Sequence, residues 1–215
     1  MKTNFEKRIL SSIILIPLSF FVIIKGSFLF SFFLLTCFFV AIYEWHRMSK
    51  KKNYLMPGYL FLFFSFYCTY NLRSLFGNDG LSVFLLVIII CISSDLGGYF
   101  FGKILKGPKL TKISPNKTYA GMFGGYFLSL VSTNLFFYYA YFENFKVFTA
   151  EMFILVLLIS SISQIGDIII SYFKRLSKIK NTGKIIPGHG GLLDRIDGMI
   201  FAFPFSYVVF TIKDI

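Results

Sequence analysis

The sequence contains few charged residues. Asp, Glu, Lys and Arg together make up only 15% of the 215 residues, and hydrophobic residues make up 56%. In a typical soluble domain about a quarter of the residues are charged. The scarcity of charge excludes an ordinary soluble domain and predicts an all-α integral membrane protein.

Cysteine is also scarce, and a basic domain is absent. Cys37, Cys68 and Cys91 lie inside apolar runs without metal-ligand spacing, which excludes a cysteine metal site and indicates no redox compartment. The net charge of +12 is distributed between apolar runs, so we expect no nucleic-acid partner. The first apolar run is interrupted by Pro17 and is followed by no small-residue cleavage site. We therefore expect it to be retained as a helix.

Long apolar runs dominate the rest of the chain. A helix needs about 20 mostly apolar residues to cross a bilayer, with a lower limit of roughly 17. Seven runs meet this requirement and predict about seven transmembrane helices. They are residues 9–25, 27–43, 54–70, 81–99, 119–142, 151–170 and 196–212.

Basic residues indicate the orientation of these spans. With the N-terminus in the cytoplasm, 18 of the 22 Lys and Arg residues lie in cytoplasmic segments and 4 lie outside. This asymmetry predicts a cytoplasmic N-terminus and an external C-terminus. We divide the chain into an N-terminal region of about three spans, residues 1–80, and a catalytic region, residues 81–215, with cytoplasmic loops at 100–118 and 171–195.

The most polar segment is residues 164–197. It contains three carboxylates, Asp167, Asp194 and Asp197, together with several cations. Carboxylates that can bind a divalent metal, beside cations that can bind phosphates, are the groups that phosphoryl transfer requires. The cations are Lys174, Arg175, Lys178, Lys180, Lys184 and Arg195.

Helical spacing predicts which of these side chains share a face. Asp167, Ser171, Lys174 and Lys178 follow one another at i, i+4, i+7 and i+11 on one helix face. Gln164 lies one turn earlier, facing the protein interior. Asp194 and Asp197 are spaced i, i+3, so that both can bind one divalent ion and leave positions for water and phosphates. The alternative is that Arg195 simply pairs with one of them.

A glycine-containing loop, residues 188–191, leads into the last predicted helix. Exposed backbone N–H groups at such a place can bind phosphate oxygens. His189, between the glycines, could contact phosphate, act as an acid or base, or have no role.

A second polar segment, residues 95–125, lies on the same predicted face. Asp95 stands near the membrane end of its span, where it either serves a site or pairs with a nearby lysine. Lys117 is near the start of the next helix, where free N–H groups favour anions. Gly121, Gly124 and Gly125 allow the close approach of either a ligand or another helix.

These motifs resemble a known family. The run from Ser171 to Asp197 is similar to the signature of the phosphatidate cytidylyltransferases, or CDP-diacylglycerol synthases: Ser-x-x-Lys-Arg, a Lys-Asp step, then His-Gly-Gly-x-x-Asp-Arg-x-Asp. Residues 95–102, 114–118 and 124–125 look like a second block of that family. The resemblance covers roughly the second half of the chain.

The resemblance implies an enzyme of the bacterial cytoplasmic (inner) membrane, with its active site on the cytoplasmic face. It would join CTP and phosphatidic acid to give CDP-diacylglycerol and pyrophosphate among membrane lipids, using Mg²⁺. A second cation and a homodimer are left open. The implied metal ligands are Asp167, Asp194 and Asp197. The implied catalytic residues are the same three carboxylates together with Lys174, Arg175 and His189. The implied substrate-binding residues are Ser171, Lys117, Asp95, Lys184, Gly190, Gly191 and Arg195.

The chain also departs from the family pattern. Ile170, Asn181 and Ala120 stand where family members commonly have Glu, Asp and Glu. A CDP-alcohol phosphotransferase is disfavoured because its Asp-Gly-x-x-Ala-Arg motif is absent. An ion-coupled transporter with intramembrane Asp95 and Asp167 is the alternative function, but no two halves of the sequence look alike and the polar residues gather on one face.

Overall fold

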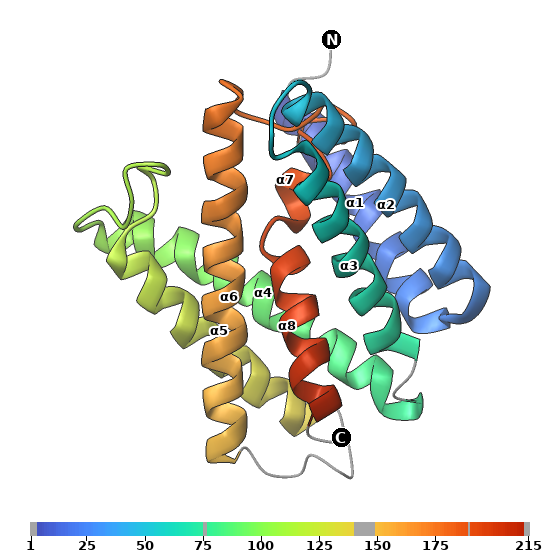
Figure 1. Ribbon diagram of the computed structural model, residues 1–215. Helices are drawn as coiled ribbons and strands as arrows, with labels where there is room; N and C mark the ends of the chain where they lie inside the picture. The colour runs from blue at the N-terminus through green and yellow to red at the C-terminus, as the bar shows by residue number, and fades with distance from the viewer. Residues whose placement is uncertain (1–3, 75–76, 140–148, 189, 213–215) are drawn as a thin grey trace.

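The computed structural model describes residues 4–74, 77–139, 149–188 and 190–212. These residues form helices and no β-strand apart from two isolated bridges, as predicted for an all-α protein. Figure 1 shows their arrangement. The helices are α1 (Asn4–Lys25), α2 (Ser27–Ser49), α3 (Leu55–Ser74), α4 (Gly77–Leu105), α5 (Tyr119–Tyr139), α6 (Ala150–Leu176), α7 (Leu193–Ile196) and α8 (Met199–Ile212).

Several of these helices are suited to a bilayer. Within the described part of the chain, four are long and apolar enough to cross it: Ser27–Ser49, Gly80–Leu105, Tyr119–Tyr139 and Ala150–Leu176. Two shorter apolar helices cover Leu10–Lys25 and Met199–Ile212. The structure therefore supports a membrane protein, whereas seven spans and the orientation of the termini stay predictions.

Helices α4 and α5 form a closely packed pair that runs obliquely past α6 (Figure 1). Glycine makes this approach possible, because a Cβ on Gly121 would lie 2.7 Å from the carbonyl oxygen of Gly98, and a Cβ on Gly125 would lie 3.0 Å from that of Ser94. Of the two interpretations of these glycines, helix packing is thus confirmed. The loop predicted to begin at residue 100 begins only at 106. Helix α4 continues to Leu105, and its packing on α5 extends to Gly102, where a Cβ would lie 3.5 Å from the Cα of Gly121.

The other predicted loop is also shorter than expected. Helix α6 continues to Leu176, and the loop occupies residues 177–192 before α7 begins. The predicted continuous helix over 196–212 is wrong, because a turn at Asp197 and Gly198 separates α7 from α8. Gly198 packs so closely on α6 that a Cβ there would lie 2.9 Å from the carbonyl oxygen of Ser163.

A hydrophobic cluster joins the N-terminal helices to this region. Trp45 of α2 is buried and packs edge-on against Phe173 of α6, with ring centroids 5.2 Å apart. The same cluster includes Leu193 of α7 and Ile200 of α8. The end of α2 is thereby held against the loop of residues 177–192, while the division of the chain at residue 80 stays a prediction.

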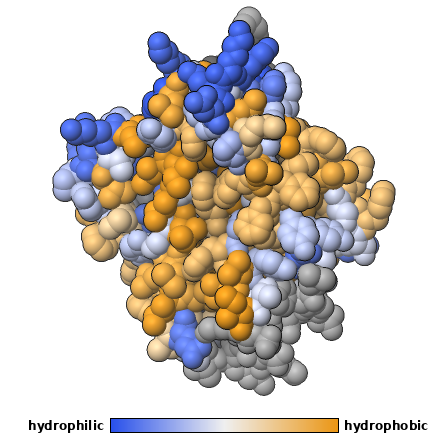
Figure 2. Space-filling view, viewed as in Figure 1, coloured by the Kyte–Doolittle hydropathy of each residue, from blue (hydrophilic) through white to orange (hydrophobic). Residues whose placement is uncertain are grey.

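Hydrophilic side chains concentrate at one end of the molecule. In Figure 2 they cover the upper end, where Figure 1 places the C-terminal end of α6 and the loop after it. Apolar side chains form a broad belt below. On the face shown, the strongest concentration of hydrophilic side chains therefore lies at the end that bears the loop after α6.

Candidate active site

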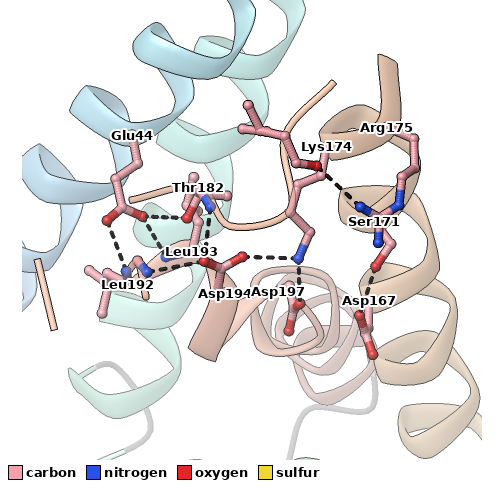
Figure 3. A network of polar contacts seen from close by, with 12 residues as sticks. Glu44, Asp167, Ser171, Lys174, Arg175, Thr182, Leu192, Leu193, Asp194 and Asp197 are labelled. Atoms are coloured by element: carbon pink, nitrogen blue, oxygen red, sulfur yellow. Dashed lines mark hydrogen bonds and ion pairs between the residues drawn. The ribbon is translucent and has the colours of Figure 1, made fainter. Parts of the chain in front are cut away.

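The predicted polar stripe of α6 is present as far as Lys174. Its last member, Lys178, lies in the loop instead, because α6 ends at Leu176. Asp167, Ser171 and Lys174 lie along one side of the helix in Figure 3, and the Ser171 hydroxyl donates to Asp167 Oδ1 at 3.3 Å. Gln164, one turn earlier, is partly buried and donates to the carbonyl oxygen of Met122 on α5 at 3.5 Å. The stripe therefore faces the helix bundle, as the spacing predicts.

Lys174 connects α6 to the α7–α8 segment. Its side chain is buried, and Nζ lies 3.0 Å from Asp194 Oδ1 and 3.9 Å from Asp197 Oδ2. The two carboxylates thus share one side, as their i, i+3 spacing predicts. A buried ammonium group is stable only with such partners, so this contact fixes the end of α6 to α7.

Asp194 also organises the loop that precedes it. Its second oxygen, Oδ2, accepts hydrogen bonds from the backbone N–H of Thr182 at 2.9 Å and of Gly191 at 3.0 Å. Together with Lys174, these donors engage both carboxylate oxygens. In this structure Asp194 therefore stabilises the conformation of the loop.

Asp167 and Asp197 form a second pair of carboxyl groups. Asp197 lies in the turn between α7 and α8, before the apolar helix begins. Burial raises the pKa of the Asp197 carboxyl well above its usual range, the neighbouring charge of Asp167 raises it further, and Lys174 opposes the shift. Two neighbouring carboxyl groups that repel one another in this way, the Asp197 group buried and the Asp167 group partly exposed, can bind a cation between them.

The second polar segment contacts the first. Lys117, in the loop before α5, forms an ion pair with Asp167 at 2.5 Å, and its Nζ donates to the carbonyl oxygen of Gln164 at 3.3 Å. Asp95 of α4 is near enough to interact electrostatically with Asp167, Lys117 and Arg195. The structure thus brings Lys117 and Asp95 next to the segment of residues 164–197, as expected, while their part in a substrate site stays a prediction.

The donor set fits a divalent cation at Asp167 and Asp197, since hard cations take carboxylate oxygens and complete their coordination with water and substrate phosphate. Among the described residues, no three His, Cys, Asp or Glu side chains lie close enough together to hold a metal ion. Asp194 is engaged by Lys174 and the loop. The three-carboxylate metal centre therefore stays a prediction, and the pair is the part of it that the structure brings together.

Other predicted residues lie further from the carboxylates. Arg175 is exposed and donates from Nη1 to the carbonyl oxygen of Ile179 at 3.2 Å, which closes the turn after α6. Lys184 and Arg195 are exposed. His189 falls outside the described residues. Their predicted roles toward substrate stay predictions.

The glycine loop is folded back on itself. Gly190 has a φ of +95°, which glycine adopts without strain, and its N–H donates to the carbonyl oxygen of Ile186 at 3.2 Å. The N–H of Gly191 donates to Asp194. Because both N–H groups serve the loop itself in this structure, phosphate binding by Gly190 and Gly191 stays a prediction.

Sequence reasoning missed Glu44 and Thr182. Glu44 of α2 is fully buried, and its carboxylate accepts hydrogen bonds from the Thr182 hydroxyl and from the backbone N–H groups of Leu192 and Leu193 (Figure 3). The available signal was an acidic residue at the end of an apolar run, which is costly in a membrane helix unless it has partners.

Comparison with known proteins shows the family of the chain. A model of the cytidylyltransferase family matches residues 6–78 and 60–213. The chain is 31% identical to a phosphatidate cytidylyltransferase of Rickettsia bellii (strain RML369-C) over 215 residues, 97% of this chain and 91% of the relative. It is 38% identical to a phosphatidate cytidylyltransferase of Staphylococcus aureus (strain COL) over 148 residues, 68% of this chain and 52% of the relative. The chain belongs to the cytidylyltransferase family.

Proposed function

We propose that this protein is a phosphatidate cytidylyltransferase, which condenses CTP and phosphatidic acid to CDP-diacylglycerol and pyrophosphate for phospholipid synthesis. The observation that carries the proposal is the meeting of Asp167 and Asp197 with Lys117 and Lys174 at the polar end of an apolar helix bundle. A water-soluble nucleotide and a membrane lipid can both reach such a place. The family and the names of its relatives favour this transferase over the ion-coupled transporter.

In the reaction, a phosphate oxygen of phosphatidic acid attacks the α-phosphorus of CTP. The new P–O bond forms as the bond from the α-phosphorus to the bridging oxygen breaks, and pyrophosphate leaves with that electron pair. The nucleophile is already an anion, so no residue has to remove a proton from it. Positioning and charge neutralisation are therefore the main tasks of the protein.

Lys117 and Lys174 are placed for these tasks. Two anionic substrates repel one another, and ammonium groups beside the carboxylates reduce that repulsion. Lys174 is fixed by two carboxylates, whereas Lys117 is held by Asp167 and one carbonyl oxygen, and can turn toward a phosphate. Ser171 fixes the orientation of Asp167 through its hydrogen bond.

Asp167 and Asp197 would hold Mg²⁺. When bound, Mg²⁺ supplies charge stabilisation to the nucleotide phosphates and the leaving pyrophosphate. The carboxylates also hold Lys117 and Lys174 close to the place where the phosphates would react. A second cation would need donors beyond this pair, for which Asp95 is the nearest candidate.

We place the protein in the bacterial cytoplasmic membrane with this site on the cytoplasmic face. The excess of Lys and Arg in segments on the side of the site supports that orientation, and CTP is a cytoplasmic nucleotide. A homodimer stays a prediction.

The test is the reaction itself. Protein purified in detergent is incubated with labelled CTP, phosphatidic acid and Mg²⁺, and lipid-soluble label and pyrophosphate are measured together. We expect equal amounts of both products, and neither when phosphatidic acid is left out. Absence of labelled lipid above the level of a heat-inactivated sample would refute the proposal.

A further inference from the structure

Both ends of the loop of residues 177–192 are attached to the same short stretch of α2. At its start, the Ser177 hydroxyl donates to the carbonyl oxygen of Met48 at 2.7 Å. At its end, the N–H groups of Leu192 and Leu193 donate to Glu44 Oε1 at 3.0 Å and Oε2 at 2.9 Å. A helix outside the polar motifs thus holds the loop that bears them.

The middle of the loop is attached to the same carboxylate. The Thr182 hydroxyl donates to Glu44 Oε2 at 2.9 Å, while the Thr182 N–H donates to Asp194 Oδ2 at 2.9 Å. Thr182 is buried and therefore links the Glu44 carboxylate to the Asp194 carboxylate. Asp194 in turn contacts Lys174, so a continuous chain of contacts runs from α2 to the site.

Two glycines make room for Glu44. A Cβ on Gly191 would lie 2.5 Å from Glu44 Oε2 and 2.7 Å from Oε1, and a Cβ on Gly183 would collide with the same carboxylate. Glycine is required at these two positions because the Glu44 carboxylate occupies the space that a Cβ would fill, and not because of the backbone angles. The loop is therefore shaped around the Glu44 carboxylate.

We propose that Glu44 is a positioning residue for cytidylyl transfer: it holds Thr182, Leu192 and Leu193 so that Asp194 places Lys174 beside Asp197. This inference rests on the proposed function. Glu44 is fully buried and its oxygens are occupied by three donors of the loop, so it acts through the loop without touching substrate.

The experiment uses Glu44→Gln, which keeps the size of the side chain and replaces one acceptor oxygen with an NH₂ donor. Wherever the amide points, it faces a donor and leaves at least one loop N–H or O–H unpaired. We expect kcat to fall about 10- to 100-fold, the range typical of residues that orient a reacting group, with the KM for phosphatidic acid unchanged. Glu151→Gln, at the far end of α6, is the matched control.

A second readout reports loop position without using activity. Lys180 and Lys184 are exposed, and we expect trypsin to cut there faster in Glu44→Gln at a temperature where wild type and variant are both folded. Gly191→Ala should reproduce both effects. Thr182→Val should have a smaller effect, and adding it to Glu44→Gln should cause less loss than the two single changes combined.

Unchanged kcat and unchanged cleavage in Glu44→Gln would overturn the proposal. So would a fall in thermal stability that accounts for the lost activity with no faster cleavage at Lys180 or Lys184. An inactive wild-type protein would refute the proposed function instead, and the cleavage measurement would still decide whether Glu44 holds the loop.

Discussion

Lys174 and Lys117 each form an ion pair with a carboxylate at this site, and the two ion pairs differ in their exposure to solvent. The Lys174 side chain is 10% exposed and its partner Asp194 is 6% exposed, whereas Lys117 and Asp167 are 24% and 27% exposed. Lys174 joins two segments that are also connected by the loop, while Lys117 reaches α6 from the loop before α5. The contact of Lys174 with Asp194 is therefore buried, whereas the contact of Lys117 with Asp167 is partly exposed.

Because of this difference in exposure, we expect the two ion pairs to contribute differently to the stability of the fold and to catalysis. Breaking a buried ion pair leaves an uncompensated charge and destabilises the fold strongly, whereas a partly exposed pair contributes little to stability. Lys117 and Asp167 are therefore free to respond to substrate and metal. The comparison predicts that changes at Lys174 act on fold and activity, and changes at Lys117 act on activity alone.

The largest expected effects come from the carboxylates. We expect Asp167→Asn and Asp194→Asn each to lower CDP-diacylglycerol formation by at least about 100-fold, a loss typical of removing electrostatic stabilisation from a reaction centre. Only Asp194→Asn should lower the detergent melting temperature, because only Asp194 also holds the loop. Equal melting temperatures of the two variants would show that Asp194 does not hold the loop.

Lys174→Met should be the most destabilising lysine change. It leaves Asp194 and Asp197 buried without their cation, which costs about 3–5 kcal/mol by analogy with other broken buried pairs. Thermal unfolding in detergent, followed by loss of the folded peak in size-exclusion chromatography, measures this. A melting temperature equal to that of wild type would contradict the structural role of Lys174.

Lys117→Met should change stability by no more than about 1 kcal/mol, because its ion pair is partly exposed. Its activity should nevertheless fall about 10- to 100-fold, since a cation that can reach substrate phosphate is lost. Lys112→Met, on an exposed residue of the same loop, is the control and should retain activity. Full activity of Lys117→Met would show that Lys117 only balances the charge of Asp167.

Arg175→Ala should have the smallest effect of these five changes. Its described contact is one hydrogen bond to the carbonyl oxygen of Ile179, which is worth about 0.5–1.5 kcal/mol. We expect a small fall in melting temperature and near wild-type activity. A loss as large as that of Asp167→Asn would instead assign Arg175 to the substrate, as the family resemblance implies.

Local spacing predicted the parts of the site that lie on one segment. Asp167, Ser171 and Lys174 share a helix face because helical periodicity is set by the backbone, and Asp194 lies near Asp197 for the same reason. Spacing also placed Gln164 toward the interior. The helical class followed from the apolar composition, because backbone groups in a membrane must pair internally.

Contacts between segments that are distant in the sequence could not be predicted from local spacing. Glu44 meets Thr182 across 138 positions, and Lys117 meets Gln164 across 47. Which helices pack together determines such pairs, and no periodicity within one segment contains that information. The break at Asp197 and Gly198 was missed because it depends on the close packing of Gly198 against α6.

The most direct measurement is a Mg²⁺ titration of CDP-diacylglycerol formation by the wild-type protein and by Asp197→Asn in the same detergent. We predict that wild-type activity disappears in excess EDTA and returns with Mg²⁺, and that Asp197→Asn stays inactive at every Mg²⁺ concentration while remaining folded. Full wild-type activity in EDTA, or a folded Asp197→Asn as active as wild type, would contradict the assignment of cytidylyl transfer to this pair of carboxylates.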